Sequence, residues 1–471
     1  MARTRQPRSQ QRNRPSDAVS RRTVILHIHL RATLDEEGRG VNWRDDTPVG
    51  RVSIDIASAV SRVASEPTPF AAPPSPAPVR FNFDAGWPCP ATFPIDDLRR
   101  LAARSLDDPT VLGYTSVRSD GQGAVYAAPD FPARDELALG DPRLREEIGR
   151  WLGRRGARSL TAANVVLTSG SAQAIALCAA ALVDPGDTAI VEWPTFPFAV
   201  RSLTIKGAAI ARVRVGPDGL DVDELQCLLS ELSARGARPR LLYTIPTHHP
   251  PTGAVLPLEA RQRVLALAEQ WNLVVVEDAV YSDLHFGEAP PPSLLELDTT
   301  GRVIQVHSFS KILAPGLRVG WACGYPEMIE RLATVREDLG VSRWLSRILA
   351  SYLEEGRLAG HLDEVRRTYR HRRDVAAAAL RAGCGDAVEF ELPGGGLYLW
   401  VTVDDSVDWP AAREAAARRG VAVRGLETLA QADLPVRQCF RLGYAHLAET
   451  ELERGIAILS EEIVAARTTP S

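Results

Sequence analysis

The chain of 471 residues contains only two lysines, Lys206 and Lys311, although lysine and arginine together number 55. Nearly all of its positive charge is therefore carried by arginine. A guanidinium serves a protein surface as well as an ammonium group does, but it stays protonated and cannot form an imine at neutral pH. Because a lysine amine can form one, the scarcity of lysine makes each of the two a candidate for amine chemistry.

The sequence also lacks the spacing of a metal or disulfide framework. Its six cysteines show no Cys-x-x-Cys or Cys/His pattern, so we expect neither structural disulfides nor a metal site. This usage fits a reducing, cytoplasmic compartment.

Long hydrophobic runs are missing as well. No apolar segment approaches the roughly 20 residues that cross a bilayer, and no Arg-then-apolar signal peptide is visible. The net charge of -4 gives no strong attraction to polyanions. We therefore expect a soluble protein whose partners are small molecules, with neither nucleic acid nor membrane among them.

Composition divides the chain into four parts. Residues 1–79 form an N-terminal extension that we expect to be partly disordered and to end in a Pro/Ala linker. The stretch 1–22, rich in Arg, Ser and Gln, suits a disordered tail or a transit peptide. We expect residues 80–139 to contribute to a small domain and to the entrance of a site, residues 140–340 to form a large domain, and residues 341–471 to form a C-terminal small domain.

Short apolar runs alternate with helical patterns from about Gly140. Five of the runs predict strands, at 164–167, 188–192, 240–244, 273–277 and 303–307. Short continuous apolar strands separated by helices indicate an α/β fold with a parallel sheet covered on both faces. Beyond about Val341, long Arg/Glu helices precede two further strand patterns, near 388–392 and 397–403. This change predicts a smaller α+β lobe.

Lys311 follows directly on a predicted strand, in the run SFSKILAPGLRVGW that begins at Ser308. Residues at that position lie at the carboxyl edge of a parallel sheet, where ligands bind. An amine there can condense with an aldehyde, while Ser308, Ser310 and Arg318 can hold a dianionic phosphate. By itself, the same run could be a loop with a charged tip.

The run resembles the lysine motif of the class I/II aminotransferases, which are pyridoxal 5'-phosphate (PLP) enzymes of fold type I. The resemblance implies that Lys311 forms a Schiff base with PLP and later shuttles a proton, and that Ser308, Ser310 and Arg318 contact the phosphate. It also implies a mostly parallel seven-stranded sheet in the large domain, which binds PLP, and a homodimer with shared active sites.

A second match lies upstream, where the run VVVEDAVY ends a predicted strand at Asp278, at a separation from Lys311 similar to that in the family. The family places such an acid against the pyridine nitrogen. A carboxylate there keeps that nitrogen protonated, so the ring can accept electrons when a bond at the substrate α-carbon breaks. Tyr281 resembles the family's phenol that hydrogen-bonds the 3'-oxygen of the cofactor. The catalytic residues implied are Lys311, Asp278 and Tyr281.

Further matches follow in the family's order. Ser171 and Ala172 lie in the turn TSGSAQ, which resembles the phosphate-binding turn and precedes a predicted helix. The resemblance implies three other contacts: Phe196 would stack on the ring, Tyr114 would reach the neighbouring subunit's phosphate, and Arg441 would clamp the substrate α-carboxylate. Gly86 is also assigned to substrate binding, and PGGGLYLW at 393–400 resembles the glycine hairpin near the substrate.

The sequence departs from the family at one functional position. The element Asn-Pro-Thr-Gly is replaced by Pro250-Pro251-Thr252-Gly253, so the asparagine that would donate to the 3'-oxygen is a proline without a donor. A second departure is the insertion-like stretch at 115–139, which could be a lid over the site or a surface loop.

Three functions remain open at this stage. The leading one is transamination of an L-amino acid to a 2-oxo acid. The second is other PLP chemistry at the α-carbon, such as oxidation, elimination, replacement or decarboxylation, in a biosynthetic pathway. The third is a ligand-sensing regulator, although residues 1–79 show little that resembles a helix-turn-helix.

Overall fold

The computed structural model describes residues 75–113, 134–154, 156, 159–425 and 438–468, together with four three-residue strands between residues 24 and 54. Tyr114, most of the N-terminal extension and residues 115–133 of the insertion lie outside these described residues. Contacts divide the chain into two compact units, Met1–Pro67 and Thr68–Ser471. The finer domain boundaries expected above remain a prediction.

The first unit contains two antiparallel strand pairs. Strand β1 (Val24–Leu26) pairs with β4 (Val52–Ile54), and β2 (Ala32–Leu34) pairs with β3 (Val41–Trp43).

The second unit is built on a large sheet. Its strand order is β6 (Val165–Thr168), β13 (Gly320–Cys323), β12 (Val303–Ser308), β11 (Val274–Asp278), β10 (Pro239–Thr244), β7 (Thr188–Trp193), β8 (Ala209–Gly216) and β9 (Gly219–Leu220). The neighbours from β12 to β8 pair in parallel, whereas β13 runs antiparallel to both β12 and β6. The mostly parallel seven-stranded sheet is therefore confirmed, with the two-residue β9 added as a hairpin on β8.

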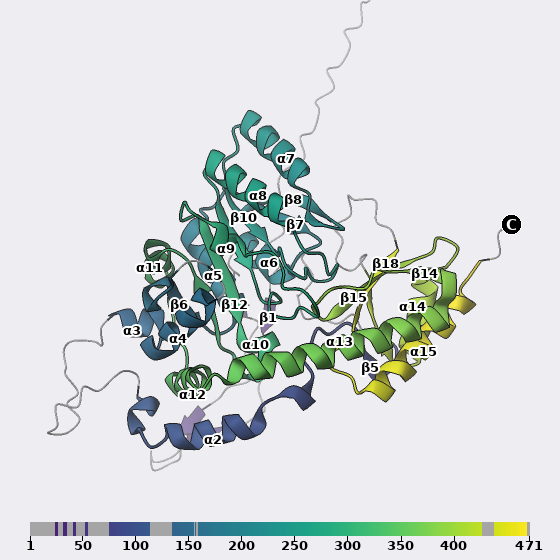
Figure 1. Cartoon of the computed structure of the whole chain (residues 1–471), viewed down its shortest axis with the longest axis horizontal. Helices are drawn as coiled ribbons and strands as arrows, with labels where there is room; N and C mark the ends of the chain where they lie inside the picture. The colour runs from purple at the N-terminus through teal and green to yellow at the C-terminus, as the bar shows by residue number, and fades with distance from the viewer. Residues whose placement is uncertain are drawn as a thin grey trace, which may run out of the picture. The chain divides into compact units, whose positions relative to one another are not determined.

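Helices cover both faces of this sheet (Figure 1). Because side chains alternate along a strand, neighbouring residues enter different cores. Ile190 packs in one cluster and Val191 in the other. One face is covered by α5 (Ser171–Leu182), α6 (Pro197–Ile205) and α11 (Pro326–Thr334). The other face is covered by α4 (Pro142–Gly153), α7 (Val222–Ala234), α8 (Leu258–Gln270), α12 (Arg343–Glu354) and α13 (Arg357–Cys384).

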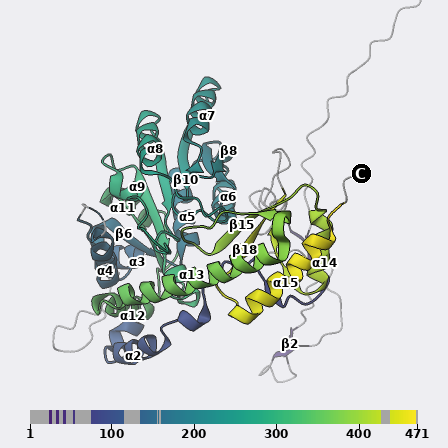
Figure 2. The same ribbon diagram turned by 45° about the vertical axis from the view of Figure 1, so that its right-hand side comes forward.

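The smaller lobe contains an antiparallel sheet in the order β14 (Val388–Glu389), β15 (Tyr398–Val403), β18 (Cys439–Gly443) and β17 (Arg424–Gly425). Strand β5 (Phe81–Asn82) pairs in parallel with β16 (Val421–Ala422), which brings the segment after residue 80 into this lobe. The long helix α13 packs on α15 (Glu449–Ala465) and runs from the large sheet to the small one (Figure 2).

The remaining described α-helices are α2 (Ile95–Ser105), α3 (Arg134–Leu139), α9 (Leu294–Leu297), α10 (Phe309–Ile312) and α14 (Trp409–Arg418). Across the described ranges, no helix is long and apolar enough to cross a membrane.

Candidate active site

Lys311 lies where the central strand β12 gives way to a helical turn. Ser308 ends the strand and caps α10, accepting a hydrogen bond from the Ser310 N–H at 3.1 Å. The Lys311 amine is partly buried and donates to the carbonyl oxygen of Gly86 at 2.8 Å. Burial, followed by the nearby charges of Arg441 and Arg318, lowers the pKa of Lys311 to about 8. A larger fraction of this amine is therefore neutral and nucleophilic near neutral pH than for an ordinary lysine.

Arg318 and the start of α5 form an anion cradle beside Lys311. Arg318 has a left-handed backbone, with φ of 50°, and donates to Ser310 Oγ at 3.3 Å and to the Ser169 carbonyl at 3.0 Å. Gly170 permits this approach, because a Cβ there would lie 2.6 Å from Arg318 Nη2. No side chain caps α5, which begins at Ser171 and continues through Ala172. The first N–H groups of that helix and its dipole can therefore meet a phosphate.

Asp278 lies at the carboxyl end of β11 and is 5% exposed. Its two oxygens accept hydrogen bonds from the Tyr243 hydroxyl at 2.6 Å and from the Val280 N–H at 3.1 Å. Burial raises the pKa of this carboxyl despite those bonds. A cation held against Asp278, such as a protonated ring nitrogen, would supply the counter-charge that keeps it ionised.

Tyr243 was not singled out from the sequence. It lies on β10, in register with Val276 of β11, so its side chain shares a face with Asp278 two residues farther on. The only sequence signal was a tyrosine next to two leucines in a predicted strand.

A second group of residues near Lys311 contains two tyrosines and an arginine, which are Tyr281, Tyr398 and Arg441. Burial, followed by the nearby Tyr398 and Asp278, raises the pKa of Tyr281 well above its ordinary value. The guanidinium of Arg441 lies over the Tyr398 ring at 5.2 Å from its centre. Gly86 is fixed against the same tyrosine, since a Cβ at Gly86 would lie 1.9 Å from the Tyr398 hydroxyl oxygen.

The same group contains two charged residues that were not selected from the sequence, Asp84 and Arg424. Asp84 accepts hydrogen bonds from both Arg441 and Arg424. Because Asp84 lies near the start of the second unit and both arginines lie near its end, the three residues offered no local motif.

Other selected positions lie on other segments of the chain. Phe196 precedes α6 and packs its ring 5.3 Å from that of Phe198. Tyr114 lies outside the described residues. At the departure from the family motif, His248 is 4% exposed and has no hydrogen-bond partner among the described residues, and burial lowers its pKa to about 4. It is therefore neutral at physiological pH.

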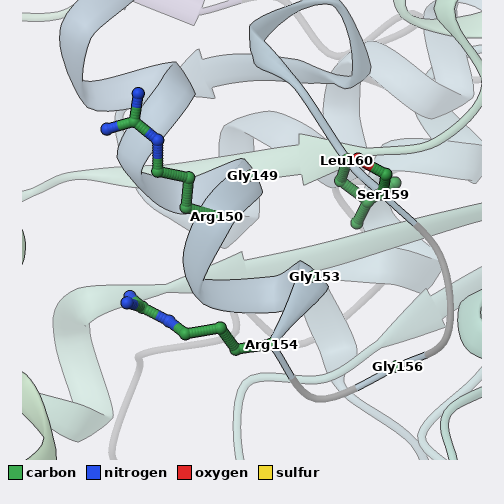
Figure 3. A pocket seen from close by; sticks show the side chains of 7 residues that line it. All are labelled: Gly149, Arg150, Gly153, Arg154, Gly156, Ser159 and Leu160. Atoms are coloured by element: carbon green, nitrogen blue, oxygen red, sulfur yellow. The ribbon is translucent and has the colours of Figure 1, made fainter.

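A separate surface pocket lies at the end of α4 and shares no lining residue with the cluster around Lys311. Figure 3 shows it between Gly149, Arg150, Gly153, Arg154, Gly156, Ser159 and Leu160. Arg150 and Arg154 extend to the same side, away from Ser159 and Leu160, and Arg150 is paired with Glu147. None of the residues predicted for the reaction lines this pocket.

The assembled residues fit PLP. A partly buried amine can receive its aldehyde, the Arg318 cradle its phosphate, and the buried Asp278 carboxylate its ring nitrogen. Among the described residues, no cluster of His, Cys, Asp or Glu could hold a metal ion.

Comparisons with known proteins agree with this arrangement. The family model of aminotransferase class I and II matches residues 138–459. The aromatic-amino-acid aminotransferase 1 of Thermococcus litoralis is 31% identical over 389 residues, which cover 80% of this chain and 86% of that protein. The crystal structure of Pyrococcus horikoshii kynurenine aminotransferase, solved with PMP, kynurenine and its product, superposes with a TM-score of 0.74 at 29% identity, covering 84% of this chain and 93% of that one.

An uncharacterized HTH-type transcriptional regulator of Bacillus subtilis is also similar, at 31% identity over 332 residues, which cover 69% of this chain and 66% of the regulator. The family match nevertheless spans most of the chain, and the chemistry of the cluster agrees with it. The chain therefore belongs to the aminotransferase class I and II family and is a PLP-dependent aminotransferase.

Proposed function

We propose that the chain transfers the amino group of an L-amino acid to a 2-oxo acid, with Lys311 as the residue that binds PLP and moves the α-proton. The observation that supports this best is the partly buried Lys311 amine, with its pKa lowered to about 8, close enough to Arg441 to be influenced by that charge. An amine with a carboxylate receptor near it suits a substrate that carries an amino group and a carboxylate on one carbon.

PLP, when bound, supplies an electrophilic aldehyde and a ring that accepts electrons from the α-carbon. The chain's residues would do the rest. Asp278, held by Tyr243, keeps the ring nitrogen protonated. Arg318, Ser308 and Ser310, with the start of α5 at Ser171 and Ala172, hold the phosphate. Lys311 Nζ would accept the proton that leaves the substrate α-carbon and deliver it to the carbon on the other side of the amino nitrogen.

The remaining contacts of the proposal concern the ring and the substrate. Tyr281 hydrogen-bonds the 3'-oxygen, and Phe196 stacks on the ring. Arg441 binds the substrate α-carboxylate close to Gly86. We further propose a homodimer in which Tyr114 reaches the partner's phosphate, in a reducing, cytoplasmic setting.

For the side chain of the substrate, we propose an aromatic amino acid. This choice rests on the aromatic-amino-acid aminotransferase and the kynurenine aminotransferase among the similar proteins. The Tyr398 ring lies under the Arg441 guanidinium, and Trp87 follows Gly86 in the chain, with its ring edge to face with that of His446 at 5.4 Å. Such rings can contact an aromatic side chain.

The test is a panel of amino acids added singly, without oxygen, to the holoenzyme. Transamination converts the yellow cofactor to its colourless amine form, with one equivalent of 2-oxo acid detected by mass spectrometry. A turnover that releases ammonia or carbon dioxide, with the yellow form retained, would instead support the second function.

That second candidate, other PLP chemistry at the α-carbon, is favoured by one observation. Pro250 removes the donor that the family directs at the 3'-oxygen. The regulator hypothesis rests on the similarity to the Bacillus subtilis protein. A gel-shift assay showing sequence-specific DNA binding that resists salt would support it.

A further inference from the structure

Arg424 and Arg441 lie directly opposite each other in the small sheet. They are register partners in the antiparallel pair of β17 and β18. Their side chains are only 10% and 19% exposed. Like charges that face each other across a ladder destabilise the pairing, and burial removes the water that would screen them. The pair therefore requires an anion between the two strands.

Asp84 supplies that anion from a distant part of the chain. Its backbone follows Phe83, whose N–H donates to the Ala422 carbonyl at 2.8 Å and whose carbonyl accepts from the Gly443 N–H at 2.7 Å. These bonds fix the segment between the small-sheet strands. Burial works to raise the pKa of Asp84, but the hydrogen bond from Arg424 and the charge of Arg441 outweigh it, so that the pKa lies below its usual value.

The two arginines share Asp84 unequally. Arg424 donates from Nε to Oδ1 at 2.7 Å and from Nη2 to Oδ2 at 2.8 Å, which is a two-point pair with both oxygens. Arg441 donates from Nε and Nη2 to Oδ1 alone, at 3.0 and 2.6 Å. No hydrogen bond from Arg441 Nη1 to a described residue is present in the structure, so this nitrogen can serve a ligand.

The net charge of the cluster depends on both arginines. Asp84 alone would neutralise Arg441 and compete with any incoming carboxylate for its guanidinium. Because Arg424 pairs with both oxygens of Asp84, the three residues together keep one net positive charge. That charge lies next to the Lys311 amine, since Gly86, two residues after Asp84, accepts the Lys311 hydrogen bond.

We propose that Arg424 is a positioning residue for substrate recognition, which pairs with both oxygens of Asp84 so that the cluster keeps a net positive charge and Arg441 Nη1 stays available to bind the α-carboxylate. This inference rests on the proposed role of Arg441 in binding the substrate carboxylate. Arg424 does not itself touch the substrate. It acts through the charge of Asp84.

The experiment compares three variants of the holoenzyme. Arg424→Gln brings the cluster to zero net charge, Arg424→Lys keeps one positive charge, and the double variant Asp84→Asn with Arg424→Gln restores one positive charge without either partner. Calorimetry measures the Kd of hydrocinnamate, an unreactive carboxylate, and of hydrocinnamide, its uncharged amide. Steady-state kinetics give KM and kcat for the best amino acid of the panel.

We expect Arg424→Gln to weaken hydrocinnamate binding about tenfold, an effect of about 1.4 kcal/mol, with hydrocinnamide binding unchanged. The KM for the amino acid should rise and kcat should change little. Arg424→Lys and the double variant should bind hydrocinnamate within about threefold of the parent, a difference of less than about 1 kcal/mol. Thermal unfolding and the yellow absorbance confirm that each variant is folded and loaded.

Two outcomes overturn the inference. One is Arg424→Gln binding hydrocinnamate as tightly as the parent, and the other is a double variant that stays as weak as Arg424→Gln. Arg441→Gln separates this failure from that of the proposed function. If Arg441→Gln also binds hydrocinnamate normally, the carboxylate site lies elsewhere and the proposed role of Arg441 is wrong.

Discussion

Lys311 Nζ donates a hydrogen bond of 2.8 Å to the carbonyl oxygen of Gly86, a residue 225 positions earlier in the chain. This bond joins the two lobes at the site, since Lys311 follows the central strand β12 of the large sheet and Gly86 lies in the segment that pairs with the small one. One site therefore contains the Lys311 amine, the segment at 84–86 and Arg441.

Replacing Lys311 by alanine should abolish the yellow, borohydride-reducible adduct and lower kcat by about 10³-fold or more, in line with loss of a positioned proton-transfer group. Lys206 is the matched control, because it is the only other lysine and is exposed at the end of α6. Lys206→Ala should keep both the adduct and the activity. A reducible adduct that survives in the Lys311 variant and disappears in the Lys206 variant would reverse the assignment.

Recombination of cofactor-free protein with PLP should depend on pH through Lys311. The neutral amine is the nucleophile, and the pKa of Lys311 is lowered to about 8. Below that pH the rate should rise about tenfold per pH unit, and above it the rate should level off. Stopped-flow absorbance measures it. A rate that keeps rising to about pH 10 would show an amine with an ordinary lysine pKa.

The hydrogen bond from the Tyr243 hydroxyl should help to keep the Asp278 carboxyl ionised. Tyr243→Phe removes a hydrogen bond to the carboxylate, and because that bond works to lower the pKa of Asp278, the pKa should rise further. The ionised form is then less populated, and we expect kcat to fall about tenfold, from the loss of about 1.5 kcal/mol in a charged hydrogen bond. Tyr352→Phe, at an equally buried tyrosine of α12, should leave kcat unchanged.

Replacing Asp278 itself should cost more than changing its partner. Asp278→Asn keeps the shape and loses the charge, so the ring nitrogen is no longer held protonated, and kcat should fall by about 10² to 10⁴. Cofactor binding through the Arg318 cradle should largely survive, as judged by retained absorbance after dialysis. Activity near that of the parent would mean that Asp278 does not face the ring nitrogen.

Gly86→Ala tests the close approach of the N-terminal segment to Tyr398. The new methyl group would lie 1.9 Å from the Tyr398 hydroxyl oxygen, so the segment or the ring must shift. We expect a loss of about 1 to 3 kcal/mol in the free energy of unfolding. Gly287→Ala is the control, because a Cβ there meets nothing within 4 Å. Chemical denaturation measures both, and equal stability of the two variants would contradict this close packing.

The sequence by itself predicted five strands of the large sheet, which are β6, β7, β10, β11 and β12, together with the residues at strand ends, but it did not predict β8. Mostly apolar runs predicted β7, β10, β11 and β12 to within one residue, because strands buried on both faces are predominantly apolar. The carboxyl ends of two of these strands then placed Asp278 and Lys311 at one edge. Four-residue β13 was not predicted as a strand, since so short a run carries no periodicity of its own.

Only the tertiary structure decided which charges and hydroxyls act on those residues. The hydrogen bond from Tyr243 to Asp278 depends on the register of β10 against β11. Arg424 and Arg441 share Asp84 because β17 pairs with β18 and because Asp84, from the start of the second unit, binds both side chains. Local patterns report burial and turn chemistry, which act between near neighbours in the chain. Electrostatic interactions depend on distances between groups in space, and these distances are set only when the two lobes pack.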